Sequence, residues 1–142
     1  MDPTNPDVVY IGSHNTGIYK TETAGEQWRK LNLSVGRVPD IAIASDNANM
    51  IYAAHQNTIL KSIDGGEQWV ITYADPQGGM INNVELDWSA PQRLFATTST
   101  GTILKSEDYG VTWTVIFETA EPLTQLIISP HDARIFYALE LD

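Results

Sequence analysis

The chain has 142 residues, of which 42% are hydrophobic and 18% charged, with no cysteine and a formal net charge of −10. This composition is typical of an ordered globular protein, and it excludes a disordered chain, a disulfide framework and thiolate chemistry. Nucleic acids and anionic membranes require a basic footprint, which eight scattered Lys and Arg residues do not supply, so we expect neither as a partner.

No segment is predicted to span a membrane or to direct secretion. No apolar run approaches the roughly 18 residues needed to cross a bilayer, so we expect no membrane insertion. Residues 1–7 lack a basic region followed by an apolar stretch, and we therefore expect no signal peptide. The compartment stays open: a cytoplasmic protein, a mature exported protein and a piece of a longer chain all fit.

The predicted elements, taken in chain order, are short strands that repeat. Runs of β-branched and aromatic residues are bounded by Pro, Asn, Asp and Ser, as strands are, and no segment has a helical periodicity of useful length. The aromatic residues of one run, Tyr10, Tyr52, Phe95 and Tyr137, stand 42, 43 and 42 residues apart. The predicted strands are 8–12, 17–20, 29–33, 41–44, 50–53, 58–61, 70–73, 84–86, 93–96, 102–105, 114–117, 126–128 and 135–139.

A nine-residue motif recurs three times, at Lys20–Trp28, Lys61–Trp69 and Lys105–Trp113. Its frame is Lys, Ser or Thr, any residue, Asp, any residue, Gly, two more residues and Trp, with Thr23 replacing the Asp in the first copy. Four antiparallel strands in a repeat of about 42 residues are typical of a β-propeller blade. A β-sandwich spaces its strands similarly but does not repeat a motif at this period. We therefore predict an all-β fold of propeller blades.

The motif resembles the Asp-box, or BNR repeat, of sialidases, sortilin-like receptors, xyloglucan-active glycoside hydrolases and the photosystem II assembly factor. The resemblance implies a propeller in which each box forms the hairpin between the third and fourth strands of a blade. In such a hairpin the Asp accepts hydrogen bonds from its own turn, the Gly adopts a positive φ, and the Trp pins the hairpin to its blade. The predicted structural box residues are Thr21, Gly25, Trp28, Ser62, Asp64, Gly66, Trp69, Ser106, Asp108, Gly110 and Trp113.

Counting the predicted strands gives too few blades for a ring. We predict one partial array, with an incomplete first blade at 1–37, whole blades at 38–80 and 81–122, and the first strands of a further blade at 123–142. Propellers have about four to eight blades, and an open array exposes apolar faces and strand edges. We therefore expect a homo-oligomer in which two copies close a six- to seven-bladed ring. The alternative is a piece of a longer chain.

The face opposite the box hairpins, around the expected channel, is the predicted ligand face. It gathers three hairpins and the inter-blade loops 33–40, 74–83 and 118–125. Any one of its polar side chains is also compatible with a solvated loop residue, and the ligand is either protein or glycan. The candidate ligand-binding residues are His14, Arg37, Asp40, His55, Asn82, Asn83 and Gln125.

Neither a metal nor a cofactor is expected. His14 and His55 occupy equivalent loops, but a zinc site needs three or four ligands and the remaining His131 lies on the opposite face. A calcium loop needs more oxygen ligands at alternate positions than any copy of the motif contains.

Catalysis within a single chain is not expected. Glycoside hydrolysis usually requires two carboxylates about 5–10 Å apart. Asp40 precedes its predicted strand and Asp87 follows its own, so they should lie at opposite ends of the ring, while Glu85 is in phase to point away from the side that its neighbours face. The Arg-Ile-Pro signature of sialidase-like enzymes is also absent.

Three hypotheses remain for the function. The first is a non-catalytic module that self-associates into a ring and binds protein or glycan on its channel face. The second is a fragment or subunit of an Asp-box glycoside hydrolase, with carboxylates elsewhere or at the interface between copies. The third is a structural protein built from stacked propeller pieces.

Overall fold

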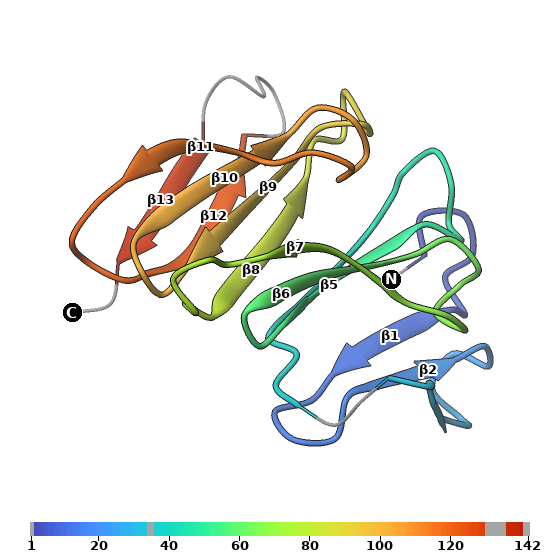
Figure 1. The fold of residues 1–142 in the computed structure, drawn as a ribbon. Coiled ribbons are helices and arrows are strands. Elements are labelled where there is room, and N and C mark those ends of the chain that lie inside the picture. The colour runs from blue at the N-terminus through green and yellow to red at the C-terminus, as the bar shows by residue number, and fades with distance from the viewer. Residues whose placement is uncertain (1, 34–35, 130–135, 141–142) are drawn as a thin grey trace.

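The computed structural model describes residues 2–33, 36–129 and 136–140, which form thirteen antiparallel strands (Figure 1). No helix in these ranges is long and apolar enough to cross a membrane. The strands form four sheets, and within each sheet neighbouring strands are consecutive in the sequence. This arrangement confirms the all-β prediction of propeller blades with four antiparallel strands.

The four sheets follow one another along the chain, and each is a simple meander. The first contains β1 (Val9–Gly12), β2 (Ile18–Thr21) and β3 (Arg29–Lys30). The second contains β4 (Asp40–Ile43), β5 (Ile51–His55), β6 (Thr58–Ser62) and β7 (Val70–Ala74). The third contains β8 (Ile81–Leu86), β9 (Leu94–Thr98), β10 (Thr102–Ser106) and β11 (Thr114–Glu118). The fourth contains β12 (Leu123–Ile128) and β13 (Phe136–Glu140).

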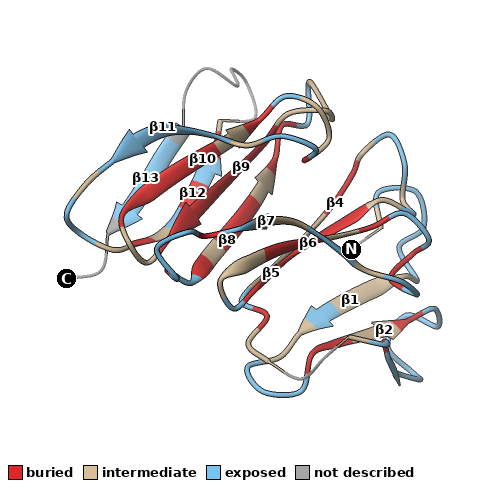
Figure 2. Ribbon diagram, in the orientation of Figure 1, coloured by how far each residue is buried: buried red, intermediate tan, exposed pale blue. Residues whose placement is uncertain are grey.

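The first strand of each complete sheet lies inside the array and the fourth lies outside. β4 contacts β8, and β8 contacts β12. By contrast, β7 and β11 are largely exposed (Figure 2). Inner strands therefore line a common axis, as the repeat predicted.

Most strand bounds shift by one or two residues from the prediction, and three of them differ by three residues. β8 and β12 begin at Ile81 and Leu123 instead of 84 and 126, so the predicted loop residues Asn82, Asn83 and Gln125 lie in strands. The outer strand predicted at 29–33 ends at Lys30, because the Leu33 N–H bonds back to the Leu31 carbonyl (2.9 Å) and turns the chain out of the sheet. The inner strand predicted at 41–44 starts one residue earlier, with Asp40 paired to Ala54. Residue 135 of the last predicted strand lies outside the described residues.

The core consists of one apolar cluster at each junction between sheets. Ala53 and Leu60 belong to the cluster that joins the first and second sheets. Tyr52 and Ala54, which precede and follow Ala53 in β5, belong to the cluster that joins the second and third sheets. Because successive residues of a strand point to opposite faces, β5 is buried throughout. Burial of a large apolar side chain such as that of Leu60 stabilises the folded chain by roughly 1.5–3 kcal/mol.

A tyrosine clamp reinforces two of the junctions. The Tyr10 hydroxyl donates a hydrogen bond to the Gly65 carbonyl (3.1 Å), and the Tyr52 hydroxyl donates one to the Tyr109 carbonyl (2.8 Å). Gly65 and Tyr109 hold the same place in their boxes, so Tyr10 on β1 and Tyr52 on β5 each tie their own sheet to the box hairpin of the next sheet. Lys61 donates to the same Tyr109 carbonyl at 2.8 Å.

Each complete box is a closed network of local hydrogen bonds. The Ser62 hydroxyl accepts the Gly66 N–H (2.8 Å) and donates to the Asp64 carboxylate (2.8 Å). That carboxylate also accepts the N–H groups of Glu67 and Gln68, both at 3.0 Å. Donation by the Gln68 N–H is the main reason that the pKa of Asp64 is lowered. In the third box the Thr112 side chain is the main reason that the pKa of Asp108 falls to about 2.

The glycine and tryptophan of the box complete the hairpin. Gly66 has a φ of +94°, and a Cβ there would lie 2.5 Å from a methyl carbon of Leu31, so only glycine fits. The Trp69 indole N–H donates to the Gly66 carbonyl (2.9 Å), as Trp28 and Trp113 do to theirs. In the first box Thr23 accepts the Gln27 N–H through a hydroxyl (2.9 Å), which offers fewer acceptor sites than a carboxylate.

Candidate binding face

Two of the predicted ligand residues, Asp40 and Asn83, bond across the inner strands. The Asp40 carboxylate accepts the Val84 N–H (3.0 Å) and the Asn83 side-chain amide (2.5 Å). The Asn83 amide oxygen accepts the Leu126 N–H of the next sheet (3.0 Å). Burial raises the pKa of Asp40 despite these donors. These two side chains therefore link three successive inner strands.

Arg37 and Asn82 form a second link at the same end of the inner strands. The Arg37 guanidinium donates to the Asn82 amide oxygen (3.1 Å), and the Asn82 amide nitrogen donates to the Leu123 carbonyl (2.7 Å). Both side chains are partly exposed. A guanidinium has five N–H donors, so Arg37 keeps further donors for a ligand. The structure thus brings Arg37, Asp40, Asn82 and Asn83 together, and ligand binding by them stays a prediction.

No side-chain bond joins the remaining predicted ligand residues to this group among the bonds described, although His55 follows Ala54, which pairs with Asp40. His14 is exposed, and its Nδ1 bonds the neighbouring Asn15 side chain (2.9 Å). Gln125 is exposed on β12. His55 is buried at the end of β5, where only 8% of it is exposed, and its Nε2 has no hydrogen-bond partner.

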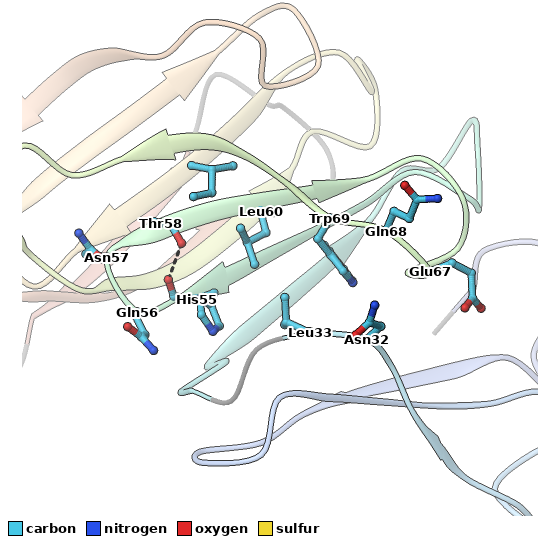
Figure 3. Close-up of a pocket in the computed structure, with 11 residues that line it drawn as sticks. Asn32, Leu33, His55, Gln56, Asn57, Thr58, Leu60, Glu67, Gln68 and Trp69 are labelled. Atoms are coloured by element: carbon cyan, nitrogen blue, oxygen red, sulfur yellow. Dashed lines mark hydrogen bonds between the residues drawn. The ribbon is translucent and has the colours of Figure 1, made fainter.

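His55 lines a cleft of about 550 Å³ between the first and second sheets (Figure 3). The side chains of Asn32 and Leu33 lie on one side of the cleft, and Trp69 points toward them from the other (Figure 3). The sequence prediction assigned Trp69 only a structural role. The other lining residues are Gln56, Asn57, Thr58, Leu60, Glu67, Gln68 and Ile71.

The carboxylates of Glu85 and Asp87, near the inner strands, have different surroundings. Glu85 lines a small pocket of about 150 Å³ between β4 and β8, where burial, and secondly the charge of Asp40, raise its pKa to about 7. Asp87 follows β8 and is held by Arg93 (2.9 Å) and Ser89 (2.6 Å). Although burial opposes the change, these bonds lower the pKa of Asp87. Within the described ranges, no group of three or more His, Cys, Asp or Glu side chains is arranged to hold a metal ion.

Comparison with known proteins identifies the fold. No protein-family model and no curated protein matches the chain. Solved structures do match, and the structure of an ancestral GH74 enzyme has a TM-score of 0.85 at 20% identity, covering 97% of this chain and 21% of that one. The GH74 xyloglucanase from Xanthomonas campestris gives 0.75 at 14% identity, covering 89% of this chain and 24% of that one. YCF48 bound to D1 peptide gives 0.69 at 20% identity, covering 88% of this chain and 42% of that one.

The chain thus spans between about a fifth and two fifths of the length of these structures. At these identities the likeness establishes the fold alone. Together with the box hairpins, it shows that the chain is a partial β-propeller of the Asp-box kind, similar in fold to the GH74 and YCF48 propellers.

Proposed function

We propose that the chain is a non-catalytic Asp-box propeller module whose copies associate head to tail to close a ring, and that the ring binds protein or glycan on its channel face. The observation that carries the proposal is the exposed apolar face of the fourth sheet. On that face Ile127 is 47% exposed, Tyr137 64% and Leu139 49%. Such a contiguous apolar surface is typical of an interaction site.

The same positions form the junctions inside the chain. In the third sheet Phe95 stands where Tyr137 does, and it packs against Leu126 and Ile128 of the fourth sheet. In the second sheet the equivalent Tyr52 packs against the third sheet. The exposed face of the fourth sheet therefore corresponds to the faces of the second and third sheets that pack against the following sheet.

The first sheet exposes the opposite side of the same kind of junction, namely the face that would pack against a preceding sheet. Ile11 is 47% exposed, whereas Ala53, the equivalent residue of the second sheet, is buried against the first. The two ends of the array thus carry the two complementary halves of one kind of interface. An interface of this heterologous kind generates a closed ring when the rotation per copy permits it. The short span relative to complete propellers is compatible with such an assembly.

Substitution of Ile127 tests the proposal. Ile127→Asp places a charge in the proposed interface and should shift the sedimentation coefficient to that of the monomer, because burying an unpaired carboxylate is strongly unfavourable. Val70→Asp is the matched control, since Val70 is an exposed apolar residue on the outer strand β7. Equal effects of the two substitutions, or none from Ile127→Asp, would count against the proposal. Circular dichroism establishes that both variants fold.

The ligand half of the proposal rests on Arg37 and Asn82. YCF48 is a propeller of the same fold with a peptide bound, and the partly exposed Arg37 and Asn82 offer free donors and acceptors at the channel face. Arg37→Ala should weaken binding of a captured peptide or glycan without changing the mass of the particle. Retained binding in that variant would place the ligand elsewhere.

A glycoside hydrolase subunit is the second candidate, and Glu85 is the observation that favours it. A carboxyl group whose pKa is raised to about 7 is suited to general acid catalysis near neutral pH. One of the similar structures is a xyloglucanase, so xyloglucan is the substrate to test. Release of reducing ends from xyloglucan that disappears in Glu85→Gln would support this candidate over the non-catalytic module.

A further inference from the structure

We propose that the cleft between the first and second sheets is a binding site for a neutral oligosaccharide. The inference goes beyond the proposed function and does not rest on ring closure, because the cleft is formed within one chain. Arg37 and Asn82 do not line the cleft, although the Gln56 N–H bonds the Arg37 carbonyl (3.2 Å), so side-chain substitutions test the two sites separately.

The cleft exists because the two junctions differ at one repeat position. At the second junction Tyr73 lies against Trp113, with 6.2 Å between ring centroids and 56° between ring planes. The first junction has Asn32 where the second has Tyr73, since both follow their box tryptophan by four residues. Trp69 therefore lacks the aromatic neighbour that Trp113 has, and it points toward Asn32 and Leu33 instead (Figure 3).

Trp69 offers an aromatic face rather than a polar group. Its indole N–H already donates to the Gly66 carbonyl at 2.9 Å. The ring is half-buried and held by the core cluster at this junction, so its orientation is fixed before a ligand arrives. The C–H groups on one face of a pyranose ring carry a small positive charge and suit the negative face of an indole.

The rest of the lining favours a ligand rich in hydroxyl groups. Asn32, Gln56, Asn57 and Gln68 supply side-chain amides, each with donors and acceptors, and a sugar hydroxyl both donates and accepts. Glu67 is the one charged residue among the described lining residues, and Arg29 pairs with it. A neutral ligand therefore suits this cleft better than an acidic or basic one. Its volume of about 550 Å³ is typical of a small-ligand site.

His55 is the group that remains unsatisfied. It is only 8% exposed, and no described group bonds its Nε2. A hydroxyl can serve that nitrogen as donor or acceptor, whichever tautomer the ring adopts. The adjacent Gln56 has a φ of +52°, a conformation that costs energy in a residue with a side chain and is frequent at ligand sites. The His55 Nε2 atom is itself buried, with the exposed Gln56 side chain and Gly36 beside it, so a ligand hydroxyl reaches this nitrogen only when the Gln56 side chain moves aside.

Isothermal titration with neutral hexasaccharides tests the proposal. The probes are cellohexaose, xylohexaose, mannohexaose and maltohexaose, each titrated up to 10 mM into the wild-type chain. At least one should bind with a dissociation constant below 10 mM, and its addition should change tryptophan fluorescence. The Asn32→Tyr variant restores the aromatic neighbour of the second junction and should abolish binding while leaving the unfolding midpoint unchanged or higher.

The matched controls separate this cleft from other surfaces. Trp69→Ala should weaken binding at least tenfold, whereas Trp28→Ala, which changes an exposed box tryptophan outside the cleft, should not. Arg37→Ala should leave saccharide binding unchanged, so the failure of the channel-face proposal would leave this one standing. Absence of binding by every hexasaccharide would overturn the inference, as would unchanged binding in Asn32→Tyr. Binding of a peptide that competes from the same cleft would also overturn it.

Discussion

Replacing Asn83 by Ala should remove the main polar link between three successive blades. The substitution deletes the donor to the Asp40 carboxylate and leaves the buried Leu126 N–H without its acceptor. A bond to a charged group contributes about 1.5–3 kcal/mol, and an orphaned buried donor costs about 1–3 kcal/mol. Because part of each loss is recovered by relaxation and water, we expect Asn83→Ala to lower the free energy of unfolding by about 2–4 kcal/mol.

Urea denaturation followed by tryptophan fluorescence measures this loss, with the slope m checked for constancy. Gln68→Ala is the control, because Gln68 is exposed and bonds the box through its backbone N–H alone among the bonds described. It should change stability by no more than about 0.5 kcal/mol. A loss below about 0.5 kcal/mol in Asn83→Ala would show that the link contributes nothing, and the account of the inner strands would be wrong.

Three further predictions concern titration, the first box and the tyrosine clamp. Glu85 holds its proton up to about pH 7 in the folded chain but releases it near pH 4.5 when unfolded, so the free energy of unfolding should fall as pH rises from 4.5 to 7. Glu85→Gln should flatten this part of the plot of unfolding free energy against pH. Thr23→Asp supplies the missing box carboxylate and should raise the free energy of unfolding by about 0.5–1 kcal/mol, seen as a higher melting temperature. An unchanged or lower melting temperature would contradict the inference that the first box is weaker because Thr23 replaces Asp. Tyr52→Phe removes the bond to the Tyr109 carbonyl, which Lys61 still satisfies, and should cost about 0.5–1.5 kcal/mol in urea; a larger loss would mean that the ring itself has moved.

The sequence was sufficient to predict the blades because their signals are local. Strand alternation, the Gly at positive φ and the Asp in its own turn all depend on residues within one hairpin, such as 61–69. The end of β3 was missed because a turn bond between Leu31 and Leu33 leaves no composition signal. The repeated motif therefore predicts the features that all blades share, and a particular blade differs from the others where one of its residues differs.

The candidate sites were harder to predict because they depend on contacts between repeats. Asp40 and Asn83 were singled out as polar residues beside inner strands, but their partners lie 43 or more residues away. The cleft at Trp69 carries a signal that only a comparison of junctions reveals, namely Asn32 in the place of Tyr73. His55 was found from its position in a loop, although its burial and its unpaired Nε2 required the structure.

The mass of the wild-type chain in solution tests the central claim most directly. Size-exclusion chromatography with multi-angle light scattering, run over a range of concentrations, should give a particle of twice the 15.7 kDa chain mass. That value corresponds to two copies joined through the face of Ile127 and the face of Ile11. A monodisperse 15.7 kDa particle at every concentration would contradict ring closure between copies.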